Sequence, residues 1–183
     1  MALLARTLPP PPPQELSKKT SDHTSDHDLA LVQELLGRPP SGKFAVVVRD
    51  AEGGPIVIRN HPLLDDGTPM PTLYWLCGRH EVVAVSRLEA DGGVDRAEAE
   101  VDADELATAH ARYAAERDAL IPPDHSGPRP SGGVSGTRTG VKCLHGHYAY
   151  FLAGGDDPVG RWVDARLRSA DRDGETRVRG HES

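Results

Sequence analysis

The side chains best suited to chemistry lie in one stretch, Ser131–Trp162, which reads SGGVSGTRTGVKCLHGHYAYFLAGGDDPVGRW. It combines a glycine-rich loop with basic residues, a predicted helix with a cysteine and histidines, and a second glycine turn followed by two aspartates. No other part of the chain is as rich in residues of these types. The sequence thus indicates where a site lies, but it leaves the ligand and any reaction open.

The glycine-rich loop predicts an anion site. Glycine readily adopts positive φ angles, which aim successive backbone N–H groups at one anion. The loop also leads into a predicted helix, whose first N–H groups and dipole favour phosphate. The residues of this predicted site are Gly133, Gly136, Arg138, Gly140 and Lys142. The spacing fits neither a Walker motif nor a dinucleotide fingerprint, and a flexible solvated connector is the alternative interpretation.

The helix expected over residues 141–153 suggests a metal site. Cys143 and His147 are four residues apart and share a face opposite the apolar one, so both can reach one ion. Together with Cys77 and His80 they form a formal Cys2His2 zinc set. The alternative is a small buried thiol at Cys77 and partly exposed polar residues on the helix.

Histidines and aspartates of the same stretch supply candidates for acid–base catalysis. His145 and His147 are both candidate proton donors or acceptors. Asp157 is explained as the N-cap of the next helix. Asp156 has no such structural role, and we expect it to act as a carboxylate ligand or base near His147, or else to pair with Arg161.

A further histidine, His110, lies on the inner stripe of an alanine-rich helix expected from Asp102 to Leu120, beside Leu106 and Tyr113. We interpret His110 as a core residue satisfied by a backbone carbonyl. The chain has no HExxH motif and no nucleophile elbow.

The elements that must position these residues follow from hydrophobic periodicity. Two β-branched runs joined by DAEGG predict a hairpin, and the continuous apolar run TLYWLC predicts a central third strand. The predicted strands cover residues 43–49, 55–59 and 72–77, with a possible edge strand at 94–101. The predicted helices cover residues 25–36, with Leu29, Val32, Leu35 and Leu36 facing the core, 81–90, 102–120, 141–153 and 158–168. The fold class is therefore α+β, a small, mostly antiparallel sheet covered by four to five helices.

Composition bounds the class of protein. With 183 residues, 37% of them hydrophobic, the chain supports one domain, which we place at residues 25–168. Residues 1–24, with a five-proline run, are predicted to be a disordered leader, and the charged residues 169–183 a disordered tail. A net charge of −7 argues against general nucleic-acid binding. No apolar run is long enough to span a bilayer and no signal peptide is found, so we expect a cytoplasmic location.

The segment GVKCLHGHYAYFLAGGDDPVGRWV, preceded by RPSGGVSG, resembles a family of small, mostly actinobacterial proteins known as domain of unknown function number five hundred and one. The likeness covers about Asp28 to Val163. It implies no established activity, and a gene neighbourhood with a septum-formation initiator protein and an exopolyphosphatase. The implied shared positions are Lys142, Cys143, His145, Gly154, Asp157, Pro158 and Gly160. Some relatives carry a cysteine pair where this chain has DAEGGPIV.

Three functions remain open from the sequence. The first is binding of a small phosphorylated or anionic ligand at the glycine-rich loop and the Cys/His helix. The second is a non-catalytic adaptor for cell-division or envelope proteins, whose protein partners bind through the tails. The third is zinc binding through Cys77, His80, Cys143 and His147.

Overall fold

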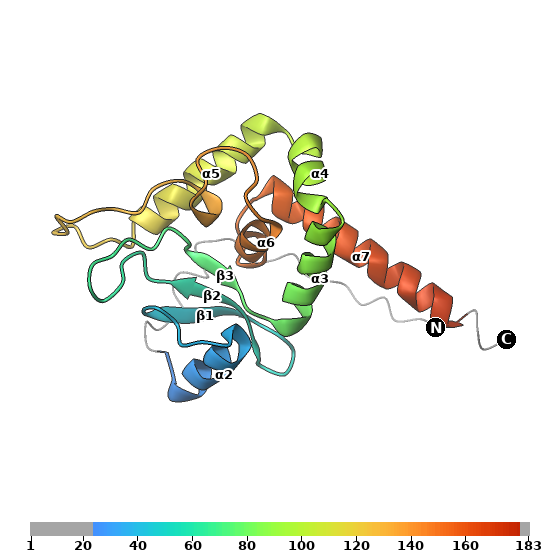
Figure 1. Cartoon of the computed structure of the whole chain (residues 1–183), viewed down its shortest axis with the longest axis horizontal. Helices are drawn as coiled ribbons and strands as arrows, with labels where there is room; N and C mark the ends of the chain where they lie inside the picture. Colours follow the sequence, from blue (N-terminus) through green and yellow to red (C-terminus); the bar gives the residue numbers. More distant parts are fainter. Residues whose placement is uncertain (1–23, 180–183) are drawn as a thin grey trace, which may run out of the picture.

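The computed structural model describes residues 24–179, which form a mixed α+β fold (Figure 1). Its strands are β1 (Phe44–Arg49), β2 (Pro55–Asn60) and β3 (Tyr74–Leu76). Its helices are α2 (Asp26–Leu36), α3 (Arg79–Ala90), α4 (Gly93–Glu100), α5 (Ala103–Asp118), α6 (Leu144–Leu152), α7 (Pro158–Arg179) and the short 3-10 helix η1 (Val134–Gly136). This confirms the predicted fold class, with six α-helices in the described part of the chain.

The sheet is antiparallel with the order β1-β2-β3. The hairpin between β1 and β2 is confirmed, and Gly53 supplies the positive φ of +90° that its turn requires. The prediction of a central third strand is wrong, because β3 pairs only with β2 and lies at the edge. Its continuous apolar character has another cause: α6 packs directly against β3 and buries it.

Two apolar clusters lie on opposite faces of this sheet. One contains Val32 of α2 with Phe44, Ile58 and Cys77. The other, larger cluster joins the opposite face to α3, α5, α6 and α7, and Figure 1 shows α2 alone below the sheet. Leu29, which we expected in the core, is 42% exposed, because only one narrow stripe of α2 touches the sheet.

The possible edge strand at residues 94–101 is instead helix α4. Val94, Ala97 and Val101 recur at helical rather than alternating spacing, and Ala97 is fully buried. Asp102 then caps α5 as expected, because its side chain accepts hydrogen bonds from the backbone N–H groups of Asp104 and Glu105.

Helix α6 differs from its prediction in two ways. It begins at Leu144 rather than near residue 141, since Cys143 has an extended backbone with φ −158°. It also has no single apolar face: His147 and Tyr150, expected opposite the core, are buried, whereas Phe151 and Leu152 are only half-buried. The reason is its place between β3, α3 and α7, which covers it on nearly all sides.

Helix α7 begins as predicted, with Asp157 as its N-cap: the carboxylate Oδ1 accepts the Gly160 N–H at 2.7 Å. It runs to Arg179, beyond the end expected near Arg168. The predicted leader, up to residue 23, and residues 180–183 of the predicted tail lie outside the described residues. Within residues 24–179, no helix is both long and apolar enough to cross a membrane.

Candidate functional site

The structure places a buried histidine–aspartate pair where α6 meets α7. His147 of α6 and Asp157 at the start of α7 both have 0% exposed side chains. The His147 Nδ1 lies 2.8 Å from Asp157 Oδ2, and the other carboxylate oxygen accepts the Gly160 N–H. Because the carboxylate accepts, His147 donates from Nδ1, and Nε2 of the neutral imidazole carries the lone pair.

That second nitrogen, His147 Nε2, has no hydrogen-bond partner. In the part of the chain that the structure describes, it is the one buried side-chain nitrogen or oxygen atom in this state. Leaving a buried polar atom unsatisfied costs roughly 1–3 kcal/mol, so native proteins rarely do so without a reason. A carboxylate on one imidazole nitrogen and a free lone pair on the other form the arrangement of a general base.

His110 of α5 lies beside this pair, with its ring centroid 5.5 Å from that of His147. Its Nδ1 accepts the Val134 N–H at 3.0 Å, and its Nε2 donates to the Gly140 carbonyl at 3.0 Å. Burial lowers the pKa of His110 below its ordinary 6.5, because desolvation disfavours the imidazolium. The interpretation of His110 as a core histidine that binds a backbone carbonyl is confirmed, and its role is to fasten both ends of the glycine-rich loop.

A buried arginine fastens the same loop from the other end of α5. Arg117 is 1% exposed and donates to the carbonyls of Gly132 and Pro130, at 2.7 and 3.3 Å. Sequence reasoning missed this residue, although a signal was present: Arg117 follows Tyr113 by four positions on the buried stripe. The hydrogen bonds of His110 and Arg117 therefore fix the conformation of the loop, which is not a flexible connector.

The backbone N–H groups expected to hold an anion are largely occupied by the chain itself. Val141 N–H donates to Glu98 Oε2 at 2.8 Å, and Leu144 N–H donates to Glu89 Oε1 at 2.5 Å. Within the loop, Gly133 N–H binds the Thr137 carbonyl and Gly136 N–H binds the Gly133 carbonyl. Two carboxylates thus stand where the sequence predicted a bound anion.

The predicted cations of the loop lie at its surface. Arg138 and Lys142 are both exposed. The Lys142 ammonium lies 3.4 Å from the Ser135 carbonyl, which places it over η1. Arg138 and Lys142 are therefore the residues of the predicted anion site that offer positive charge to an anionic ligand.

Ser135 has an unusual backbone conformation. Its φ of 55° and ψ of 20° lie in the left-handed region, which residues other than glycine seldom adopt. Its Oγ lies 3.4 Å from Cys143 Sγ. The turn sits so close to α6 that a Cβ added at Gly146 would lie 1.8 Å from Ser135 Oγ. Ser135 is not among the residues of the predicted anion site.

The structure separates His145 from His147. The His145 ring lies against α3, with Nδ1 3.1 Å from Glu89 Oε1 and Nε2 3.1 Å from Ser86 Oγ. His145 and His147 were equal candidates for acid–base chemistry. The geometry joins α6 to α3 through His145, whereas His147 faces Asp157.

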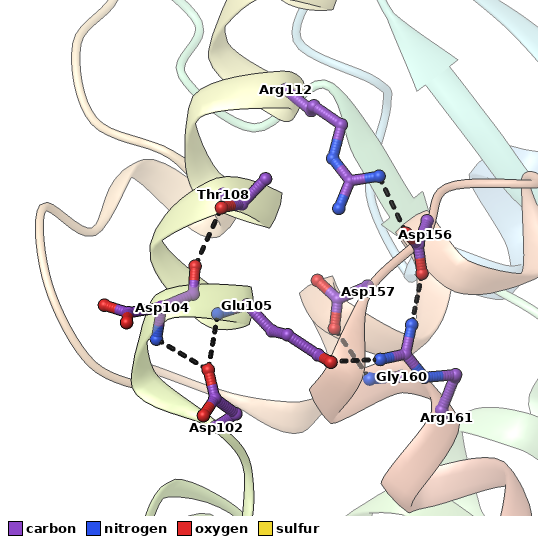
Figure 2. Close-up of polar contacts among 9 residues, drawn as sticks. All are labelled: Asp102, Asp104, Glu105, Thr108, Arg112, Asp156, Asp157, Gly160 and Arg161. Atoms are coloured by element: carbon purple, nitrogen blue, oxygen red, sulfur yellow. Dashed lines mark hydrogen bonds and ion pairs between the residues drawn. The ribbon is translucent and has the colours of Figure 1, made fainter.

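Asp156 does not take the position expected of it. It lies at the surface in an ion-pair network with Arg112 and Arg161, and Arg161 also binds Glu105 (Figure 2). The Arg112 hydrogen bond holds the pKa of Asp156 below its ordinary value. The carboxylate beside His147 is therefore Asp157, and the pairing of Asp156 with Arg161 is what the structure shows.

The four residues of the predicted zinc set are not brought together. Cys77 lies in the cluster under α2, its thiol donates to the Ile56 carbonyl, and burial raises its pKa to about 12. The side chain of His80 is 83% exposed. Among the described residues, no three side chains of His, Cys, Asp or Glu gather in a group that could hold a metal ion. Sequence spacing alone suggested this set; in the structure Cys77 packs against α2, whereas Cys143 and His147 belong to the start of α6.

The chain belongs to the family described as a protein of unknown function (DUF501), whose model matches residues 46–165. The matched region contains β2, β3, the glycine-rich loop, the His147–Asp157 pair and the first turns of α7. Searches of curated proteins and of solved structures give no match.

Proposed function

We propose that this protein binds a small anionic ligand over residues 133–143 and carries out acid–base chemistry on it, with His147 as the proton acceptor. The observation that carries the proposal is the buried, unpartnered Nε2 of His147. A histidine that served only to join α6 to α7 would need only its Nδ1 hydrogen bond. Selection for stability would then favour a hydrogen-bond partner for Nε2 as well, but Nε2 has none.

Asp157 supports this role in two ways. Its hydrogen bond fixes the tautomer in which Nε2 is free to accept a proton, and its charge stabilises the imidazolium that then forms. Because Asp157 also caps α7 through the Gly160 N–H, its own orientation is fixed by the helix. The pair is thus preorganised by backbone structure on both sides.

The charge for the ligand comes from side chains rather than from backbone. The N–H groups of Val141 and Leu144 already bind Glu98 and Glu89, whereas Arg138 and Lys142 are exposed above the same loop. His147 is fully buried, so we expect the ligand to reach Nε2 only when the residues around this atom open locally.

A thermal-shift screen tests this proposal. Full-length protein is heated with inorganic phosphate, pyrophosphate, polyphosphate, nucleotides or acetyl phosphate. A hundredfold excess over Kd stabilises the folded state by roughly 2.7 kcal/mol, which raises the Tm by several degrees. We expect Arg138→Ala and Lys142→Ala to abolish the rise for the responding compound, and Arg79→Ala, at an exposed arginine on α3, to preserve it.

Two further results complete the test. His147→Asn is expected to preserve the Tm rise and to abolish any conversion of the bound compound, since the ligand's charge is held elsewhere. A screen in which no anionic compound raises the Tm contradicts the proposal. A rise that survives both Arg138→Ala and Lys142→Ala contradicts its placement at this loop.

A further inference from the structure

We propose that a cavity at one end of the β1–β2 hairpin binds a small organic carboxylate with an apolar chain. None of the residues that line this cavity belongs to the glycine-rich loop or to the His147–Asp157 pair, so this site is additional to the proposed function. Three features support it: the size of the cavity, the face of the sheet that its basic residues share, and an exposed leucine beside them.

The cavity measures about 780 Å³ and lies where β1 begins and β2 ends. Leu29 of α2 borders it on one side of the sheet. Leu120, just after α5, also lines it and packs against the apolar cluster on the opposite side. Cavities that hold small organic ligands usually measure roughly 300–1,000 Å³ and combine apolar walls with a few polar groups. The size of this cavity therefore suits such a ligand.

The antiparallel register gathers three basic side chains on one face of the hairpin. Ala45 of β1 pairs with Arg59 of β2, and two residues along, the His61 N–H donates to the Lys43 carbonyl at 2.8 Å. Phe44 packs in the cluster under α2, and successive residues of a strand point to opposite faces. Lys43, Arg59 and His61 therefore share the face opposite α2, and all three line the cavity.

The charges of the cavity wall favour a ligand with a single negative charge. Lys43 is exposed, and its ammonium has no hydrogen bond or ion pair with another residue that the structure describes. Arg59 faces Glu116 of α5, so part of its charge is already balanced. Among the residues that line the cavity, Asp65 is the one carboxylate. A carboxylate ligand meets this modest positive excess better than a phosphate dianion does.

Leu29 gives the cavity an apolar wall next to these basic residues. Its side chain is 42% exposed, and in the described part of the chain only Val83, at 43%, is another large hydrophobic residue with such exposure. An exposed leucine alone needs no explanation. Leu29, however, lines the same cavity as Lys43 and Arg59. A ligand with both an apolar chain and a carboxylate matches this combination.

The chain that precedes the cavity has the wrong charge to occupy it. Thr24 lines the cavity, so residues 1–23 lead up to it in the sequence. Those residues include three cations and two carboxylates, namely Arg6, Lys18, Lys19, Glu15 and Asp22. A segment with more cations than carboxylates is repelled by Lys43 and Arg59, since like charges repel. A small carboxylate from solution has the complementary charge.

A set of probes separates the charge of the ligand from its apolar chain. Octanoate has both, octanamide has the chain without the charge, and acetate has the charge without the chain. We expect octanoate to raise the Tm of the full-length protein in a concentration-dependent way, and octanamide and acetate to raise it much less. Isothermal titration calorimetry then gives the Kd. A Tm that octanoate leaves unchanged or lowers overturns the proposal, as does an equal rise with octanamide.

Exposed positions on the surface supply matched variants. Lys43→Ala should weaken octanoate binding by about tenfold or more, because a charge-assisted hydrogen bond is lost. Arg79→Ala, at an exposed arginine of α3, should leave the Kd unchanged. Leu29→Ser should weaken binding several-fold, whereas Val83→Ser on α3 should not. All four side chains are exposed, so each variant is expected to fold, and its Tm without ligand verifies this.

Two results with these variants contradict the site. Equal weakening by Lys43→Ala and Arg79→Ala would reveal a general effect of charge, and a Kd unchanged in both Lys43→Ala and Leu29→Ser would place octanoate elsewhere. The proposed function depends on inorganic anions and on Lys142→Ala, whereas this site depends on octanoate and on Lys43→Ala. Either can therefore fail while the other holds.

Discussion

Two neighbouring aspartates in one turn have opposite surroundings. Asp156 is exposed and shared by two arginines (Figure 2), whereas Asp157 is fully buried and divides its oxygens between a helix N-terminus and a histidine. The first interaction is solvated and replaceable. The hydrogen bonds of Asp157 are buried, where no water can replace a missing partner, so the geometry of these hydrogen bonds is fixed. Position relative to the core, not residue type, therefore decides which carboxylate can orient a base.

Replacing Asp157 gives the largest expected effect. Asp157→Ala removes both the cap of α7 and the partner of His147, and it leaves a second nitrogen of a buried imidazole unsatisfied. We expect the free energy of unfolding to fall by about 3–5 kcal/mol, as for other broken buried pairs. Urea unfolding measures this change. A loss below about 1 kcal/mol would show that the pair is not buried as described.

Gly146→Ala tests the close contact between α6 and the η1 turn. In most helices this change is stabilising, by roughly 0.5–1 kcal/mol. Here the new methyl group would lie 1.8 Å from Ser135 Oγ, so we expect destabilisation of about 1–3 kcal/mol instead. The double variant with Ser135→Gly removes the clashing hydroxyl, and recovery of stability in thermal unfolding would confirm the contact. An unchanged or raised Tm for Gly146→Ala alone would contradict it.

The lowered pKa of His110, which lies beside the buried pair, predicts that the free energy of unfolding depends on pH. Its pKa is lowered in the folded state, so the unfolded chain takes up the proton first as the pH falls. The stability that neutral His110 contributes is complete above its ordinary pKa of 6.5 and is lost as the pH falls from there toward the lowered folded value. Unfolding free energies measured between pH 8 and pH 5 should decline, and His110→Asn should flatten the decline. Stability that rises on acidification over this range would refute the role of His110.

Asp156→Asn should give the smallest effect. Exposed ion pairs contribute roughly 0–1 kcal/mol and weaken in salt. We expect a loss within that range, diminished further in high salt, measured by the same urea unfolding. A loss as large as that of Asp157→Ala would erase the distinction between the two aspartates.

Local sequence determined much of the scaffold. The β-branched runs and the DAEGG turn specify the hairpin, and Ser25, Asp102 and Asp157 cap the helices they precede. The buried stripe of α5 placed His110 correctly. These features are readable because backbone preferences and periodic burial act over a few residues.

Long-range packing decided the site itself. Nothing local tells Asp156 from Asp157 as a partner for His147, since both follow the same glycine turn. The roles of Arg117, Glu89 and Glu98 depend on contacts with residues far along the chain, and the members of the proposed zinc set do not gather in the described part of the chain. Sequence named the stretch where chemistry is possible; only the tertiary structure decided which groups are buried, because burial depends on contacts that join distant parts of the chain.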